Sequence, residues 1–335
     1  GTSARAAKDF DGTMRGMYVQ YGPVARTSLF FQHGVLVNGP ENVRKIQLNV
    51  DCDFSSWVGY ANTVTEWFGK AILFRDYEDH RLQRRIVLSA FTADAMKSYA
   101  EKTNAIAART IENWHTVPNF IALPHLRQML VHIAAKIFYG LDEISVGAAE
   151  LSSAFTAMLN GMETVIKIDS WPFKYSRGVR GKKLVRSYLR ALIPERSRGN
   201  GTDLMSRMLR ASMDDQPPHL TEDELLDHLS LLFFAGYDTT TTTLLHMLPH
   251  RGQEHELQES MRAESMALGA CDLDIADLEK LEGIDNAFHE VLRLYPATPL
   301  TLRGTAKEVE LSEHRIPAKR LLFIPSIVNH TLPEY

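Results

Sequence analysis

The sequence has little of what marks several large classes of protein. Its 335 residues include only two cysteines, Cys52 and Cys271, which argues against a disulfide framework and a thiolate zinc site. The longest apolar run, near residues 229–235, is far shorter than the roughly 20 residues of a membrane-spanning helix. The polar start at residues 1–20 lacks the apolar core of a secretory signal. We therefore expect no membrane span and a reducing compartment, the cytoplasm.

The sequence also lacks an excess of charge of one sign. Lys and Arg number 37 against 41 Asp and Glu, a formal net charge of −4. A nucleic-acid-binding protein usually has a strong positive field, so we expect no nucleic acid partner. No G-x-G-x-x-G motif after a strand, no P-loop and no G-x-S-x-G nucleophile elbow occurs. Nothing therefore supports nucleotide binding or serine hydrolase chemistry.

Helical periodicity dominates the residues that are present. A composition of 44% hydrophobic and 23% charged residues is typical of a globular protein. No boundary divides the chain convincingly, so we expect a single domain over residues 1–335. Helices are predicted at residues 79–91, 93–115, 124–139, 178–198, 203–210, 221–248, 253–268 and 283–295. Pro249 predicts that the helix from Thr221 ends or kinks near Met247.

Two stretches carry strand patterns instead. Residues 24–37 are apolar and β-branched, and predict a hairpin whose turn is Gln32-His33-Gly34. Gly39-Pro40 then opens a helix. Residues 300–328 predict short strands, separated by His314-Arg315-Ile316-Pro317. The fold class is therefore mainly α, with small β-sheets near the N-terminus and the C-terminus.

The long helix from Thr221 contains residues that oppose helix formation. Thr221 and Glu224 form a capping box at its start. Further along, Gly236 costs roughly 1 kcal/mol relative to alanine, and Asp238 and residues 239–243, all threonine, compete with the backbone hydrogen bonds. Such conflict is expected at functional sites. It indicates either a widened groove with an acid and a hydroxyl facing a ligand, or a threonine-rich buried face.

Three further pairs have helical spacing. Glu290 and Arg293 lie among apolar residues and predict a partly buried ion pair, or else a common surface pair. His80 and Arg84 predict a face that suits a carboxylate or phosphate, or else a solvated basic helix.

His246 and His250 have metal-ligand spacing, but Pro249 disrupts it, and we predict no metal site there. The basic stretch at residues 177–198 is either a docking surface for an acidic partner or a solvated helix face.

Taken in order, these elements resemble the cytochrome P450 superfamily, the haem-thiolate monooxygenases, and in particular its soluble bacterial members. The resemblance covers nearly the whole chain and implies a cytochrome P450-like helical prism. The matching segments are Tyr21-Gly22-Pro23-Val24, His80-x-x-x-Arg84, Ala235-Gly236-x-Asp238-Thr239-Thr240, Glu290-x-x-Arg293, Tyr295-Pro296-x-x-Pro299-x-x-x-Arg303 and residues 329–335.

The resemblance implies a haem cofactor and a role for each matched residue. Gly236 would leave room for dioxygen, Thr239 would supply a hydroxyl that helps to deliver protons, and Asp238 would link that hydroxyl to solvent through water. Glu290 and Arg293 would be structural.

The resemblance also implies which residues surround the ligands. Those around haem are His80, Arg84, Ala235 and Arg303. Those expected in the substrate pocket are Phe234, Thr298, Pro299 and Leu300, with further walls at residues 57–68.

One part of the family pattern is missing. The haem-ligating cysteine of the family lies in a glycine-rich loop beyond the last matched segment. Neither Cys52 nor Cys271 has Phe-x-x-Gly-x-x-x-Cys surroundings, so no metal ligand is identifiable. We expect a chain that is truncated at both ends.

The resemblance implies a monooxygenase that hydroxylates an apolar small molecule. It would use O2 and two electrons from a separate ferredoxin or flavoprotein reductase. The alternative is a haem-free scaffold or activator protein that lacks the cysteine ligand, but the intact groove motif favours the enzyme. A helical binding module unrelated to haem would require five ordered motifs to coincide by chance.

Overall fold

The structure is a computed structural model that describes residues 2–29, 32–61, 63–142, 146–162, 164, 167–170, 172–213, 219–253, 255–269 and 272–333. The chain forms two compact units. The sheet unit comprises Gly1–Glu66, Lys70–Arg81 and Val291–Tyr335, and the helical unit comprises Trp67–Gly69 and Leu82–Glu290. The expectation of one domain over residues 1–335 stays a prediction.

The sheet unit is built on five strands drawn from both ends of the chain. Their order is β1-β2-β7-β4-β3, in which β2 and β7 are parallel and the other pairs are antiparallel. A separate hairpin pairs β5 with β6. The strands are β1 (Val24–Leu29), β2 (Gln32–Val37), β3 (Phe54–Ser55), β4 (Leu300–Thr305), β5 (Val309–Leu311), β6 (His314–Ile316) and β7 (Leu321–Pro325).

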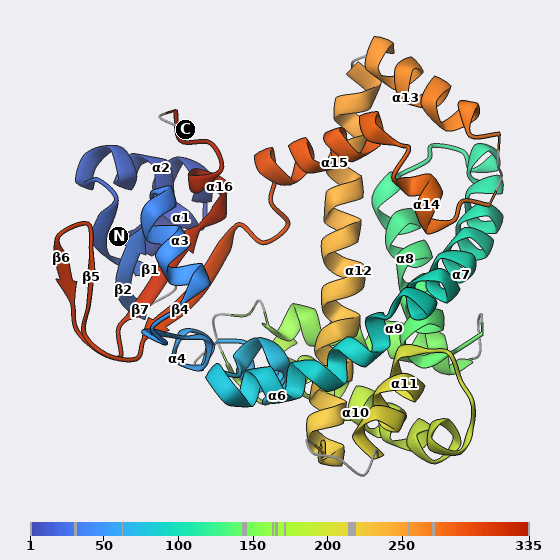
Figure 1. The fold of residues 1–335 in the computed structure, drawn as a ribbon, viewed down its shortest axis with the longest axis horizontal. Helices are drawn as coiled ribbons and strands as arrows, with labels where there is room; N and C mark the ends of the chain where they lie inside the picture. The colour runs from blue at the N-terminus through green and yellow to red at the C-terminus, as the bar shows by residue number, and fades with distance from the viewer. Residues whose placement is uncertain are drawn as a thin grey trace. The chain divides into compact units, whose positions relative to one another are not determined.

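Alternation along the strands gives this sheet two apolar faces. Leu36 and Phe323 pack in a cluster with Met14 of α2. Val35 and Leu322 pack in another cluster. Figure 1 shows the short helices of the unit around the sheet. They are α1 (Thr2–Ala6), α2 (Phe10–Tyr21), α3 (Pro40–Leu48), α4 (Ser56–Tyr60) and α16 (Ser326–Asn329).

The predicted N-terminal hairpin is confirmed, but its predicted turn is wrong. Gln32, His33 and Gly34 belong to β2, and the connection at residues 30–31 lies outside the described residues. A Cβ at Gly34 would lie 2.6 Å from the carbonyl oxygen of Leu321. This glycine therefore permits close approach to β7 and does not mark a turn. In the C-terminal hairpin the turn lies at Ser312 and Glu313, which both have positive φ.

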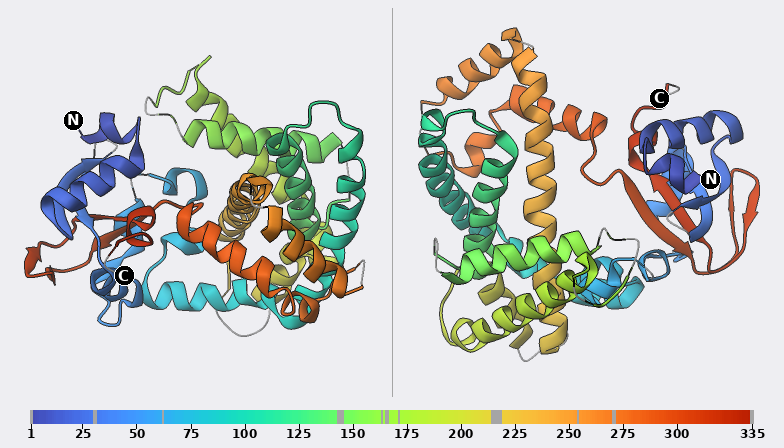
Figure 2. Two further views of the ribbon diagram at one scale, coloured as in Figure 1. Left: turned by 90° about the horizontal axis from the view of Figure 1, so that it is seen from above. Right: turned by 180° about the vertical axis from the view of Figure 1, so that it is seen from behind.

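The helical unit surrounds one long helix, α12 (Glu222–Gln253). Figure 2 shows α8 alongside α12, and α9 beside α10. The other helices within the unit are α7 (Ala93–Glu112), α8 (Ala122–Tyr139), α9 (Val146–Met162), α10 (Lys174–Arg198), α11 (Leu204–Met213), α13 (His255–Ala267) and α14 (Ile275–Leu278). Helices α5 (Thr65–Phe68), α6 (Tyr77–Leu88) and α15 (Glu282–Leu294) contribute residues to both units.

The start of α12 is as predicted and its end is not. The backbone N–H of Thr221 donates to Oε2 of Glu224 over 2.9 Å, and the N–H of Glu224 donates to the Thr221 hydroxyl over 3.3 Å, which completes the capping box. The helix continues to Gln253, so an end near Met247 is wrong, and the alternative of a kink there stays a prediction. Proline has a helical φ, and a helix of this length has many other hydrogen bonds to offset the one that Pro249 removes.

The mainly α fold with small terminal sheets is confirmed. Within the described residues, no helix is both long enough and apolar enough to cross a bilayer.

Candidate active site

The segment from Ala235 to Thr243 lies in the middle of α12 and remains helical. All five threonine hydroxyls donate to the backbone carbonyl four residues earlier, at distances of 2.6–3.1 Å. These bonds satisfy the hydroxyl protons within the helix, which is how five consecutive threonines are accommodated there. The sequence predicted competition with the helix, and the structure shows that the hydroxyls add to its hydrogen bonds.

Ala235 and Thr239 are one turn apart and share a face of α12. Ala235 is exposed, although its helix is largely buried around it. The Thr239 hydroxyl donates to the Ala235 carbonyl over 2.6 Å. Its proton is therefore engaged, and its free lone pairs can accept a hydrogen bond from a group bound beside the helix.

Gly236 faces a different neighbour. A Cβ at this position would lie 3.0 Å from Cζ of Phe138 on α8. The absence of a side chain at Gly236 thus lets α8 approach α12 closely. The predicted role of Gly236, to leave room for dioxygen, stays a prediction, whereas its contact with Phe138 was not foreseen from the sequence.

Asp238 is half-buried, and its charge environment is set partly from α8. Burial raises the pKa of its carboxyl above the ordinary value, and the positive charge of Arg127 opposes that rise. Arg127 also acts on the neighbouring Tyr237, whose pKa burial raises strongly. The sequence analysis missed Arg127, because an arginine on an ordinary amphipathic helix carries no signal of its partner.

Two aromatic residues directly before Ala235 on α12 stack on other aromatic rings. Phe233 is buried and stacks on Phe155, with ring centroids 4.4 Å apart. Phe234, predicted to line the substrate pocket, stacks on buried Phe68 with ring centroids 5.3 Å apart and remains partly accessible, and its place in the pocket stays a prediction. Phe68 lies within residues 57–68, the other stretch predicted to form pocket walls.

In the sheet unit, Arg303 lies on β4 and the predicted pocket residues lie just before it. A Cβ at Gly59 would lie 2.7 Å from Cα of Arg303, so α4 packs directly on this strand. The guanidinium of Arg303 donates to its neighbouring carbonyl at Leu302 over 2.9 Å. Thr298 and Pro299 are exposed in the preceding loop, and Leu300 is partly buried at the start of β4.

Helix α6 carries His80 and Arg84. Arg84 is exposed, and no hydrogen-bond or ion-pair partner of its guanidinium occurs among the described residues. His80 is partly exposed. The helix also carries Gln83, which the sequence analysis did not single out. Its buried amide oxygen accepts from Nε2 of fully buried His228 over 2.7 Å, which fastens α6 to α12.

Glu290 and Arg293 both lie on α15 and both are exposed, so the predicted partial burial is wrong. Arg293 donates to the carbonyl oxygen of His330 over 3.2 Å. This contact joins α15 to the segment after α16. Apolar neighbours in sequence did not bury the pair, because they occupy other faces of the helix.

The basic stretch of α10 is engaged within the helical unit. Arg186 pairs with Asp227 and lies 2.6 Å from Asp223, and Arg190 pairs with Glu222. These acids form the first turns of α12. Arg186 and Arg190 therefore bind intramolecular partners, which weakens the prediction that this stretch docks an acidic partner.

Among the described residues, the one cysteine is not part of a recognisable metal site. Cys52 is exposed, and Cys271 lies outside the described residues. Within the described part of the chain, no group of three or more His, Cys, Asp or Glu side chains could hold a metal ion. The side chain of His250 is likewise not described.

Two arginines and one face of α12 have the chemistry that a haem would need around it. The guanidinium of Arg84 has no partner among the described residues, and the guanidinium of Arg303 donates to a carbonyl oxygen. Such groups suit two carboxylates. On α12, Ala235 leaves a small exposed surface beside a hydroxyl that can accept. Arg84 in the helical unit and Arg303 in the sheet unit thus each have the chemistry to bind a propionate group of haem.

Comparison with known proteins identifies the family. The cytochrome P450 family model matches residues 4–335. A putative cytochrome P450 136 of Mycobacterium tuberculosis is 27% identical over 322 residues, which are 95% of this chain and 65% of that protein. Cyclooctat-9-en-7-ol 5-monooxygenase of Streptomyces melanosporofaciens is 25% identical over 94% of this chain and 70% of its own length. The chain thus spans about two thirds of the length of these relatives.

Solved structures share the fold. Retinoic acid-bound cyanobacterial CYP120A1 matches with a TM-score of 0.84 and 25% identity, over 95% of this chain and 73% of that one. A zebra fish cytochrome P450 solved with progesterone matches with a TM-score of 0.85 at 19% identity, over 97% and 81% of the two chains. The helical prism expected from the sequence is therefore confirmed.

Proposed function

Because this chain belongs to the cytochrome P450 family, we propose that the protein is a haem-dependent monooxygenase that hydroxylates an apolar small molecule. The observation that carries the proposal is the geometry of α12, where exposed Ala235 and the accepting hydroxyl of Thr239 share one face. A haem-free scaffold would gain nothing chemically from this arrangement.

When bound, haem would supply oxygen activation and cleavage of the O–O bond. In this proposal, the guanidinium groups of Arg84 and Arg303 would bind the haem carboxylates. His80 is a further residue that would contact haem. Ala235 provides a surface without bulk next to the reacting centre. Thr298, Pro299 and Leu300, with Phe234, form our proposed pocket for the substrate.

Thr239 and Asp238 handle protons in this proposal. The Thr239 hydroxyl is oriented by its hydrogen bond to the Ala235 carbonyl. Its lone pairs therefore accept a hydrogen bond from a donor group on the exposed face of the helix. Asp238 is half-buried, and its burial raises the pKa of its carboxyl, which brings proton exchange nearer to working pH. Adjacent residues point about 100° apart on a helix, so Asp238 exchanges protons with solvent, and the Thr239 hydroxyl accepts a hydrogen bond from the water that delivers them at the site.

An apolar substrate is supported by the proteins that this chain resembles. One relative is named for oxidation of cyclooctat-9-en-7-ol, and one structural neighbour holds retinoic acid. We propose that two electrons come from a separate ferredoxin or flavoprotein reductase, and that the protein works in the cytoplasm, as its scarce cysteine indicates.

The first experiment is an absorption spectrum of the purified full-length protein, reduced and exposed to carbon monoxide. A red-shifted, thiolate-type Soret band is the expected result. A protein of correct mass that takes up no haem would overturn the enzyme and favour the haem-free scaffold or activator.

Haem affinity of two variants sharpens this test. Arg84→Gln is expected to weaken haem binding, because it removes a guanidinium assigned to a propionate. Arg85→Gln provides the matched control, since Arg85 is also exposed and occupies the next position of α6. Equal haem affinity of the two variants would contradict the role of Arg84.

A further inference from the structure

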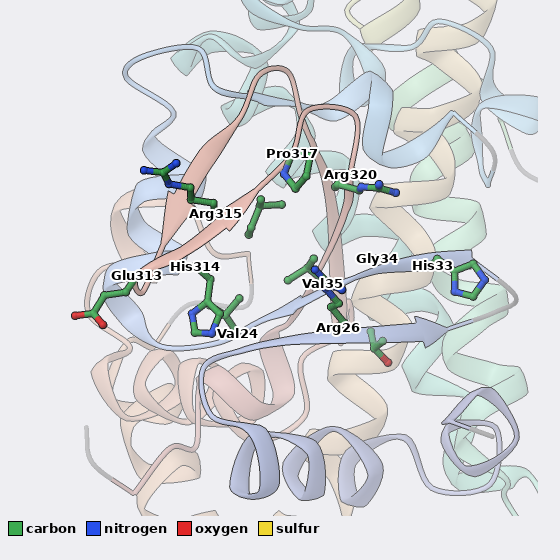
Figure 3. A pocket seen from close by; sticks show the side chains of 12 residues that line it. Val24, Arg26, His33, Gly34, Val35, Glu313, His314, Arg315, Pro317 and Arg320 are labelled. Atoms are coloured by element: carbon green, nitrogen blue, oxygen red, sulfur yellow. The ribbon is translucent and has the colours of Figure 1, made fainter.

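A groove in the sheet unit has no place in the proposed reaction. It lies between the β1–β2 hairpin on one side and the β5–β6 hairpin on the other, as Figure 3 shows. Its volume is about 560 Å³, within the range of small-molecule sites. Every residue that lines it belongs to the sheet unit.

The middle of this groove is apolar. Val24 and Val35 line it from the two strands of the first hairpin, and Ile316 at the end of β6 and Pro317 just after it line it from the other side. Val24, Val35 and Ile316 are at most 9% exposed, so they form a fixed floor that is continuous with the core of the unit. A floor of this kind favours an apolar ligand body.

The rim of the groove is cationic. Arg26 of β1, Arg320 before β7 and Arg315 of β6 line it, against a single acid, Glu313. In Figure 3, Arg320 and His33 lie toward one end of the groove, and Arg315 lies toward the other end with Glu313. The end of the groove that holds Arg320 therefore has no acidic lining residue.

Two of these arginine side chains, those of Arg26 and Arg320, make no polar contact with the described residues. Arg26 and Arg320 are exposed, and within the described part of the chain their guanidinium groups have no hydrogen-bond or ion-pair partner. The backbone of Arg320, by contrast, is fixed, because its N–H donates to the Thr305 hydroxyl over 2.9 Å. Two anchored backbone segments, β1 and the residue before β7, therefore present guanidinium groups without a polar partner among the described residues, beside an apolar floor.

We propose that this groove binds an amphiphile with one carboxylate, whose apolar body lies on Val24, Val35 and Ile316 and whose carboxylate pairs with Arg26 and Arg320. Charge complementarity carries this choice, since a planar guanidinium binds a carboxylate through two parallel hydrogen bonds. The concave apolar floor favours a small molecule over an acidic protein, which would need only the charged rim.

Dodecanoate is the probe, with dodecanol as its neutral counterpart. A photoreactive dodecanoate analogue is cross-linked to the holoenzyme, and peptide mass spectrometry locates the label. The dissociation constant of dodecanoate is measured by equilibrium dialysis. The variants are Arg26→Gln/Arg320→Gln and, as a control, Arg44→Gln, an exposed arginine of α3 in the same unit but outside this groove.

The proposal expects label in residues 24–37 and 313–321, dodecanol binding weaker than dodecanoate, and a dissociation constant raised about tenfold by the double substitution. Arg44→Gln should leave it unchanged. Added salt should weaken binding, since exposed charges are screened over about 8 Å at physiological ionic strength.

Several results would overturn the proposal. These are label found only elsewhere, an equal affinity for dodecanol, or an affinity that the double variant retains. In a further outcome, the protein binds an acidic ferredoxin or anionic vesicles but not dodecanoate, and loses that binding in the double variant. This result would assign the groove to a macromolecular partner instead. A ligand in the haem pocket is recognised separately, because it shifts the Soret band in the wild type and in the double variant alike.

Discussion

Arg186 of α10 pairs with Asp227 of α12, across 41 residues of sequence. The two side chains are only 20% and 12% exposed. Arg190, one turn further along α10, makes a similar contact with Glu222 but is 49% exposed. The same helix pair is therefore joined by one ion pair that is largely shielded from water and by another that is not.

Replacing Arg186 should destabilise the fold far more than replacing Arg190. Arg186→Ala leaves Asp227 charged in a shielded position, and we expect a loss of about 2–3 kcal/mol in the free energy of unfolding. Arg190→Ala should leave that free energy nearly unchanged, because water solvates both partners. Urea denaturation of both variants checks this, and equal losses would contradict the difference in burial.

Thr239→Ala should separate oxygen consumption from product formation. Without the accepting hydroxyl, oxygen and electrons are still consumed, but we expect the yield of product per oxygen to fall at least about tenfold. Thr239→Ser should restore most of the yield. Thr241→Ala is the matched control, because its hydroxyl makes the same bond to a carbonyl four residues earlier but lies on the buried side of α12. Unchanged coupling in Thr239→Ala would remove this role.

Asp238→Asn should stabilise the fold near neutral pH while slowing turnover. The pKa of this carboxyl is raised by burial above its ordinary value of 3.8. Between the unfolded and the folded pKa the folded state holds more protons, so the wild type loses stability as pH rises through that window. The stability gain of Asp238→Asn should therefore be present above the window and shrink below pH 3.8.

Thermal melts across pH, with turnover measured beside them, test both parts of this prediction. Arg127→Gln should raise the pKa of Asp238 further, because it removes the opposing positive charge. Loss of turnover in Asp238→Asn should reach about a hundredfold if the carboxyl relays protons. A stability difference that grows as pH falls would have the wrong sign.

Two glycine-to-alanine substitutions should act in opposite directions. A Cβ at Gly178 would lie 2.8 Å from Cα of Gly161 and 2.8 Å from the Trp67 ring, where α9 and α10 meet. Gly178→Ala should cost about 1–3 kcal/mol. Gly16 is exposed in α2 with open space around it, so Gly16→Ala should gain about 0.5–1 kcal/mol from helix propensity alone. Calorimetric melting temperatures distinguish these outcomes.

Local signals in the sequence predicted local structure well. The capping box at Thr221 and Glu224 gave the start of α12, and β-branched residues gave the first hairpin. The groove motif and its flanking segments identified the family, and the family model and structural neighbours confirm it.

Contacts between distant segments could not be predicted in this way. In the sequence, Gly34 predicts a turn, because glycine is common in turns. Its actual role depends on the carbonyl oxygen of Leu321, which lies far away in the sequence and close in space. Pro249 predicts an end of the helix near Met247, but α12 continues past it over 32 residues in all. Arg127 and Asp238 influence each other only because α8 packs on α12, and nothing in either segment specifies that contact.

The topology of the sheet has a consequence for synthesis of the protein. Strand β2 needs β7 as its parallel neighbour, and β7 lies almost 290 residues further along the chain. The first hairpin therefore leaves the ribosome with one edge unpaired, and that edge stays unpaired until residues 321–325 have emerged. Nearly all of the helical unit, by contrast, is one continuous stretch, Leu82–Glu290, which can begin to fold during that interval. The strands at residues 24–37 therefore emerge before the helical unit and gain their parallel neighbour only after it.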